Sequence, residues 1–263
     1  MSLATKIASD LPFLRRYARA LTGSQLSGDN YVRAALEAAL SDDDLREELE
    51  TGKVGLYRVF NRIWASAQAI PVIAGDTGGD HEAAAQAQLQ KVTPISRQAL
   101  LLTTLEDFST PDAASILGLS ASEVDELVSE AIGEIERESA TTVLIIEDEP
   151  LISMQLEDLV RSLGHEICGT ATTRTEAKAV VERDMPGLVL ADIQLADGSS
   201  GLDAVDDILA QEQVPVIFVT AYPERLLTGS RREPTYLVTK PFREASVRAA
   251  ISQALFFGSG RPV

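Results

Sequence analysis

The sequence contains little of the chemistry that supports disulfide frameworks, thiolate metal sites or enzymatic catalysis. Its 263 residues include one cysteine, Cys168, which excludes an intramolecular disulfide and favours a reducing compartment. Cys168 falls within a predicted strand, where we expect a small buried apolar residue. The two histidines, His81 and His165, are too few and too far apart in the chain to suggest a metal or acid–base site. No nucleophile–His–Asp set, P-loop or GxGxxG motif is present, so we expect no independent enzymatic activity.

Long apolar segments are also missing. No apolar run approaches the roughly 20 residues that are needed to span a bilayer. The N-terminal stretch 1–21 lacks the uninterrupted apolar region and the cleavage site of an export signal. The sequence therefore predicts a cytoplasmic protein with no membrane partner.

Positive charge is scarce in every part of the chain, and the net charge is −17. Residues 1–140 hold 12 Lys and Arg against 22 Asp and Glu, a net charge of −10. Residues 141–263 hold 11 against 18, a net charge of −7. Binding to a phosphate backbone depends on a basic surface, which neither half offers, so direct DNA binding is not expected.

The first 140 residues are predicted to be all-α. A helix-start signal at Ser9 and Asp10 precedes an amphipathic segment, and Gly23 provides a stop signal. Residues 71–90 are rich in Pro, Gly, Ala and Gln, which predicts a linker between a helical region at 1–70 and a second one at 91–138. Within the first region, one helical face gathers the apolar residues Leu56, Val59, Phe60, Ile63 and Trp64.

The pattern changes at Thr141, where the stretch TTVLIIED begins. This short β-branched apolar run is typical of a strand buried on both faces. Strands that alternate with helices indicate βαβ units, and we expect residues 141–263 to form a flavodoxin-like α/β domain with a five-stranded parallel sheet. The five expected strands lie in 141–148, 165–171, 187–193, 214–222 and 235–242.

Several of these strands end in polar side chains. The first ends in the acidic run 147–149, the third in Asp192, the fourth in Thr220 and the last in Lys240. Because ligands of an open parallel sheet bind beyond the carboxyl ends of its strands, these side chains should converge. Clustered carboxylates repel one another unless a cation joins them, and Mg²⁺ prefers such oxygen ligands. Lys240 adds a positive charge and Thr220 a hydroxyl donor where a phosphoryl group would sit.

This arrangement resembles the receiver domain of response regulators over about 120 residues. The resemblance implies that Asp192 accepts a phosphoryl group from a histidine kinase. It also implies a Mg²⁺ site in which Asp148 and Asp192 bind directly, Glu147 assists through water, and the Gln194 backbone carbonyl supplies another ligand.

The same resemblance assigns a switch role to Thr220, which would contact the phosphoryl group, and to Lys240, which would bridge to it. Two aromatic residues depart from the usual pattern. Tyr222 follows Thr220 by two places, and Tyr236 precedes Lys240 by four, one more than the family spacing of the switch aromatic.

The segment 107–135 looks like a helix-turn-helix with its turn at Gly118 and its second helix beginning at 120–122. It resembles the fourth region of extracytoplasmic-function sigma factors, and residues 10–68 more loosely resemble their second region. The second helix lacks the cations and amides that a DNA-reading helix needs. Between residues 123 and 138 it carries one cation, Arg137, against Glu123, Asp125, Glu126, Glu130, Glu134, Glu136 and Glu138.

A sigma-like half joined to a C-terminal receiver is similar to the PhyR-type general stress response regulators of alphaproteobacteria. That resemblance implies a protein that, once phosphorylated, sequesters a NepR-like anti-sigma factor and frees a sigma factor. The partner surface would lie within 1–138, covered by the receiver before phosphorylation, and its acidic and apolar character favours a basic amphipathic helix on the partner.

Three other interpretations stay open. A DNA-binding transcription factor controlled by the receiver would use residues 94–138, but it needs cationic contacts that the sequence lacks. A phosphate-relay protein would use the helical half only for dimerisation. The acidic helix, taken alone, is also consistent with an ordinary solvated face.

Overall fold

The computed structural model describes residues 7–69, 93–136, 139–195, 197–198, 200–223, 226–227 and 234–258. The predicted linker at 71–90 and His81 lie outside them. The chain divides into two compact units, Met1–Glu130 and Ala131–Val263.

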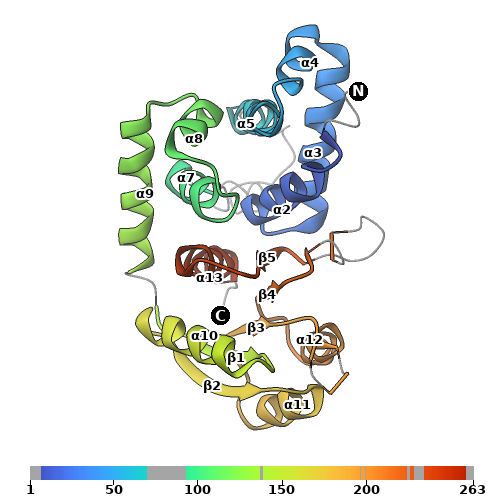
Figure 1. The fold of residues 1–263 in the computed structure, drawn as a ribbon, viewed down its shortest axis with the longest axis vertical. Helices are drawn as coiled ribbons and strands as arrows, with labels where there is room; N and C mark the ends of the chain where they lie inside the picture. The colour runs from blue at the N-terminus through green and yellow to red at the C-terminus, as the bar shows by residue number, and fades with distance from the viewer. Residues whose placement is uncertain are drawn as a thin grey trace, which may run out of the picture. The chain divides into compact units, whose positions relative to one another are not determined.

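The first unit is built from helices, as predicted (Figure 1). Helix α2 begins after Asp10 and ends at Gly23, whose φ of 64° lies in the left-handed region. The predicted helical face on α5 is buried at Leu56, Val59, Phe60 and Trp64, while Ile63 is half-buried. The helices are α2 (Leu11–Thr22), α3 (Gln25–Ser41), α4 (Asp43–Leu49), α5 (Lys53–Ala69), α7 (Ile95–Thr104), α8 (Thr110–Leu117) and α9 (Ala121–Ile135).

The predicted helix-turn-helix is confirmed by α8 and α9. Helix α8 starts at Ser109, whose side chain caps the helix by accepting a hydrogen bond from the Asp112 N–H. It ends at Gly118, which has a φ of 71°. Helix α9 runs without interruption past residue 130, so the division between the two units falls inside this helix.

The second unit is an α/β domain with a five-stranded parallel sheet of order β2-β1-β3-β4-β5. Figure 1 shows α11 and α12 on one face of the sheet and α10 and α13 on the other. The strands are β1 (Thr142–Ile146), β2 (Glu166–Ala171), β3 (Leu188–Ala191), β4 (Val216–Thr220) and β5 (Tyr236–Thr239). The helices are α10 (Pro150–Ser162), α11 (Arg174–Arg183), α12 (Gly201–Leu209) and α13 (Glu244–Gly258).

The inner strands of the sheet are buried on both faces, which explains their continuous apolar runs, whereas the edge strand β2 is mostly half-buried or exposed. All four residues of β3 are buried, as are Val143–Ile146 of β1. Cys168 on β2 packs against this core but is only partly buried, less than the sequence predicted. Among the described residues, no helix combines the length and the apolar character needed to cross a membrane.

Candidate functional site

Strand register brings the predicted site residues to one edge of the sheet. Ile146 at the end of β1 pairs with Ala191 at the end of β3, so Glu147 and Asp192 leave the sheet side by side. The Asp192 N–H donates to the Ile146 carbonyl at 2.8 Å, which fixes the start of the loop after β3. On the other side of β3, Thr220 ends β4, and the Lys240 N–H donates to the Thr220 carbonyl at 2.7 Å.

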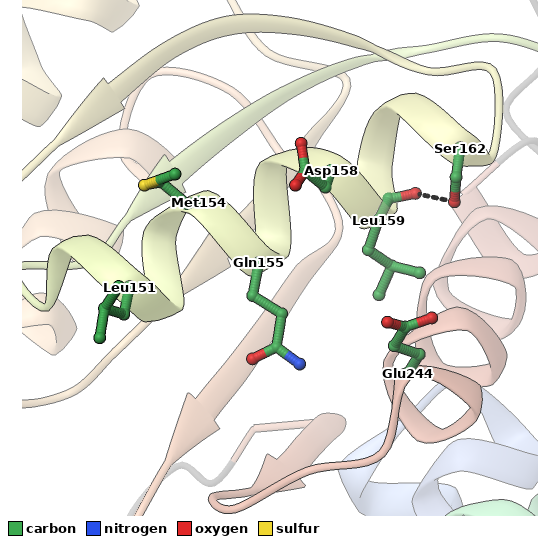
Figure 2. A pocket seen from close by; sticks show the side chains of 7 residues that line it. All are labelled: Leu151, Met154, Gln155, Asp158, Leu159, Ser162 and Glu244. Carbon is green, nitrogen blue, oxygen red and sulfur yellow. Dashed lines mark hydrogen bonds between the residues drawn. The ribbon is translucent and has the colours of Figure 1, made fainter.

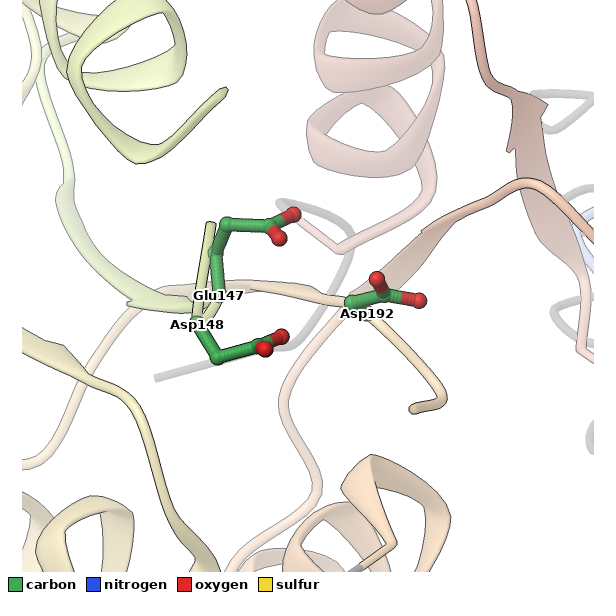
Figure 3. A group of neighbouring side chains, drawn as sticks. All are labelled: Glu147, Asp148 and Asp192. Carbon is green, nitrogen blue, oxygen red and sulfur yellow. The ribbon is translucent and has the colours of Figure 1, made fainter. Parts of the chain in front are cut away.

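Three carboxylates lie close enough together to hold one cation. Figure 3 shows the side chains of Glu147 and Asp148 extending from the end of β1 toward Asp192 at the end of β3. One ligand oxygen from each of these residues lies within 4.8 Å of the others. Glu147 Oε2 is buried and lies 2.7 Å from the ammonium of Lys240. Three clustered carboxylates with a single ammonium among them fit a hard divalent cation such as Mg²⁺.

Asp192 is held from both of its carboxylate oxygens. Oδ1 accepts the backbone N–H groups of Ile193 at 2.5 Å and Gln194 at 3.4 Å. Oδ2 accepts a hydrogen bond from Lys240 Nζ at 2.7 Å. The backbone of Gln194 therefore contacts Asp192 through its N–H, whereas its carbonyl stays a predicted metal ligand.

The ammonium of Lys240 is shared among three carboxylates. Besides Asp192, Nζ lies 2.7 Å from Glu147 Oε2 and 3.0 Å from Glu147 Oε1, and it donates to Glu149 Oε1 at 3.3 Å. Glu149 belongs to the acidic run that drew attention to this edge, but the sequence assigned it no role. Only the folded structure reveals that its side chain turns toward Lys240.

Burial and the neighbouring charges leave the pKa of both Glu147 and Lys240 raised. Burial raises the pKa of Glu147, Lys240 opposes that shift, and the charge of Asp192 adds to it. Burial lowers the pKa of Lys240, but hydrogen bonds to Asp192 and Glu147 outweigh burial, so its pKa is raised. Lys240 thus stays an ammonium, while ionised Glu147 lacks sufficient compensating positive charge, as expected for a site that recruits a cation.

The two other predicted switch residues have different surroundings. Thr220 is fully buried, and its hydroxyl oxygen accepts the Tyr222 backbone N–H at 3.2 Å. The Tyr236 hydroxyl donates to the Gln253 carbonyl on α13 at 3.3 Å, and burial raises the pKa of Tyr236. Tyr236 is not drawn into the carboxylate cluster by any hydrogen bond or ion pair among the described residues.

A pocket in the same unit lies apart from the carboxylate cluster, between α10 and the start of α13 (Figure 2). Two large apolar side chains on α10, Leu151 and Met154, are exposed there. None of the residues of the carboxylate cluster lines this pocket. Its lining consists of Leu151, Met154, Gln155, Asp158, Leu159, Ser162 and Glu244.

The helical unit has no basic surface on its helix-turn-helix. The segment Ala121–Ile135 that forms α9 contains neither Lys nor Arg, and its exposed residues include Glu123, Asp125, Glu126 and Glu130. A helix with this face repels phosphates, so the geometry gives no support to reading of the DNA major groove.

Comparison with known proteins finds family matches for both units of the chain. Residues 7–61 match the Sigma2 domain of PhyR, and residues 89–138 match the sigma-like domain of response regulator PhyR. Residues 143–252 match the response regulator receiver domain. The phyllosphere-induced regulator PhyR of Methylorubrum extorquens is 54% identical over 258 residues, which are 98% of this chain and 96% of that protein. The chain belongs to the PhyR family.

Solved PhyR structures resemble the chain along its length. The response regulator PhyR from Brucella abortus is 50% identical with a TM-score of 0.85, covering 98% of this chain and 96% of that one. The anti-anti-sigma factor PhyR from Bartonella quintana is 48% identical with a TM-score of 0.83, covering 98% and 97% of the two chains. The predicted fold class, a sigma-like helical half followed by a receiver, is confirmed for this PhyR-family chain.

Proposed function

We propose that this PhyR-family chain is a phosphorylation-activated anti-anti-sigma factor that sequesters a NepR-like anti-sigma factor. The observation that carries the proposal is that one chain joins a sigma-like helical half to a receiver. Helix α9 of the helical half is acidic, and the receiver has carboxylates, a threonine and a lysine at the ends of its strands. A helical half with this surface is unsuited to promoter DNA but can still offer a sigma-like surface to a protein that binds sigma factors. The anti-anti-sigma factor of Bartonella quintana, similar over 98% of this chain, supports the same function.

The phosphoacceptor of the proposed mechanism is Asp192. Its backbone N–H contacts hold the carboxylate at the sheet edge, and Lys240 Nζ lies 2.7 Å from Oδ2. A histidine kinase is the proposed donor. Lys240 would orient the new phosphoryl oxygens, and the Thr220 hydroxyl would donate to one of them, which changes the contacts of the loop after β4. Tyr236, whose hydroxyl donates to the Gln253 carbonyl on α13, is the third proposed switch residue.

The proposed metal ligands are Glu147, Asp148, Asp192 and the Gln194 carbonyl. Mg²⁺ bound there would neutralise carboxylate charge and stabilise the negative charge on a transferring phosphoryl group. The three clustered carboxylates, two of which share the ammonium of Lys240, support this assignment.

The proposed domain organisation follows the sequence analysis: a region-2-like part at 1–70, a linker at 71–90, a region-4-like part at 91–138 and the receiver at 141–263. The partner surface is proposed to lie within 1–138 and to be covered until Asp192 is phosphorylated. Shifting a covered state from 99:1 to 1:99 requires about 5.5 kcal/mol of differential stabilisation by the phosphoryl group. The proposed compartment is the cytoplasm, where sigma factors act.

The decisive experiment measures binding of a purified NepR-like anti-sigma factor to the full chain by calorimetry, with Mg²⁺ and with or without beryllofluoride. We expect activation to strengthen binding at least tenfold in the wild type and to have no effect in Asp192→Asn. The Glu157→Gln variant, altered on α10 at an ion pair with Arg161, serves as the matched control. Equal binding with and without beryllofluoride, or retention of promoter DNA instead, would contradict the proposal.

A further inference from the structure

The ammonium of Lys240 has as many acidic neighbours as it has protons to donate. Its three N–H groups face the carboxylates of Asp192, Glu147 and Glu149. Asp192 and Glu147 already have roles in the proposed phosphorylation site. Glu149 is not part of the carboxylate group that could hold a cation, which consists of Glu147, Asp148 and Asp192. Its contact with Lys240 therefore has no explanation in metal binding.

Glu149 also differs from the other two carboxylates in its position. Its side chain is 60% exposed, whereas those of Glu147 and Asp192 are 0% and 10% exposed. It occupies the N-cap position of α10, but its side chain makes no capping hydrogen bond to that helix. The carboxylate is directed to Lys240 instead, at the solvent-facing side of the site.

We propose that Glu149 is a positioning residue that restrains Lys240 and lowers the reactivity of Asp192 toward small anionic phosphate donors. The inference rests on the proposed phosphorylation of Asp192. Two effects act in the same direction. Glu149 competes for the ammonium that an incoming phosphoryl group needs, and its negative charge repels that group as it approaches from solvent. A donor held by a docked protein overcomes this barrier through its high effective concentration.

The reaction that Glu149 slows can be written for acetyl phosphate. A carboxylate oxygen of Asp192 attacks phosphorus and forms a new P–O bond. The P–O bond to the acetyl group breaks, and acetate leaves with the bonding electron pair. An aspartate anion and a dianionic donor thus yield a dianionic aspartyl phosphate and an acetate anion, so that atoms, electrons and charge balance without a further reactant. Glu149 forms no bond in this step and acts only through Lys240 and through its charge.

The test is the rate at which the full chain is phosphorylated by acetyl phosphate at saturating Mg²⁺, detected by mass spectrometry. We expect Glu149→Gln to raise the rate by about three- to tenfold, an order-of-magnitude estimate for removing one charge at the edge of the site. The gain should shrink as ionic strength rises, because salt screens charges exposed to solvent. Glu149→Asp, which keeps the charge, should stay near the wild-type rate, and so should Glu157→Gln on the same helix.

The direction of the rate change, with Mg²⁺ affinity measured beside it by calorimetry, separates this role from simple loosening of the loop. Removing a negative charge near the carboxylate cluster should leave Mg²⁺ affinity unchanged or lower it while phosphorylation becomes faster. A loosened site would lower both the affinity and the rate. A rate for Glu149→Gln at or below the wild-type rate would overturn the proposal while phosphorylation itself persisted. If Asp192→Asn were labelled as readily as the wild type, the proposed phosphoacceptor would be wrong, and this inference would fall with it.

Discussion

The hydroxyl of Tyr57 on α5 donates a hydrogen bond to the carboxylate of Glu106, with 2.7 Å between the two oxygens. Arg16 on α2 approaches the same carboxylate from Nε at 3.0 Å, and Lys53 Nζ donates to the Glu106 backbone carbonyl at 2.8 Å. Glu106 is 2% exposed and lies in the segment between α7 and α8. The buried residue Glu106 therefore links the two sigma-like parts of the helical unit through its hydrogen bonds to α2 and α5.

Replacing Tyr57 by Phe should weaken the helical unit. Burial and the charge of Glu106 raise the pKa of Tyr57 well above its ordinary value, so the phenol stays protonated and acts as a donor. Its loss leaves a buried carboxylate with fewer partners, and we expect a loss of about 1–3 kcal/mol in the free energy of unfolding. Urea titration followed by the fluorescence of Trp64, the only tryptophan in the chain, measures this loss within the same unit.

The matched control is Tyr31→Phe, at a half-buried tyrosine whose ring packs edge-on against Trp64. It should change the free energy of unfolding much less. Equal losses for the two variants would mean that the bond to Glu106 contributes nothing measurable.

Removing the positive partner of Glu106 should cost more than removing the phenol. Burial lowers the pKa of Arg16, but Glu106 outweighs burial and raises it, so the guanidinium remains charged. Arg16→Met leaves the carboxylate without its nearest cation, for an expected loss of about 3–5 kcal/mol. Adding Glu106→Leu should recover part of that loss, since no unpaired buried charge then remains. Additive losses in the double variant would exclude coupling between the two residues.

The pKa of Glu147 predicts how the receiver responds to pH without Mg²⁺. Burial raises this pKa above the ordinary value of 4.5, so the folded domain binds a proton at Glu147 more tightly than the unfolded chain does. The resulting stabilisation is complete below the pKa that Glu147 has in the unfolded chain. It is lost as pH rises through the pKa that Glu147 has in the folded domain. Glu147→Gln, which mimics the protonated acid, should therefore raise the melting temperature of the receiver at pH 7. That advantage should vanish at low pH and should also disappear when Mg²⁺ stabilises the wild type.

Calorimetric melts of the full chain across this pH range, with and without Mg²⁺, test the prediction. Glu157→Gln provides the control for the loss of a receiver carboxylate outside the cluster. A melting temperature of Glu147→Gln below that of the wild type at pH 7 without Mg²⁺ would show that the ion pair with Lys240 outweighs the cost of burial.

Gly201, at the start of α12, is predicted to be essential for the geometry of Asp192. A Cβ atom at this position would lie 1.7 Å from the Asp192 carbonyl oxygen. Gly201→Ala must therefore displace the backbone of Asp192, the proposed phosphoacceptor, with an expected cost of about 1–3 kcal/mol or more and slower phosphorylation. Gly198→Ala in the same loop is the control, because its φ is +80° but a Cβ there would meet nothing within 4 Å. Gly198→Ala should lower the free energy of unfolding only because alanine is strained at a positive φ. It should leave the phosphorylation rate near that of the wild type.

The sequence predicted the receiver site well because parallel strands deliver their last residues to one edge. Glu147, Asp148, Asp192 and Lys240 were placed together on that ground, and their side chains do meet. The contact between Glu149 and Lys240 was not predictable, since it depends on how one exposed side chain turns at the start of α10. Tyr236 followed its family position only approximately, and the structure directs its hydroxyl to α13.

The buried network around Glu106 was also beyond prediction. Its hydrogen bonds join residues 90 and 49 positions apart in the chain, to Arg16 and Tyr57 respectively. Periodicity places apolar residues on helix faces, but it does not reveal which polar residues meet inside. Glu106 and Asp107 form an acidic pair before a helix, a pattern equally typical of a solvated turn.

The hydrogen bond from the Tyr222 N–H to the Thr220 hydroxyl has a practical consequence for spectroscopy. If the Thr220 proton is drawn to a phosphoryl oxygen, the electron density on Oγ1 changes, and the Tyr222 amide senses that change directly. The amide resonance of Tyr222 is therefore a built-in probe of the proposed phosphorylation of Asp192, and it needs no label at that site. Its chemical shift would follow the lifetime of the activated state in real time.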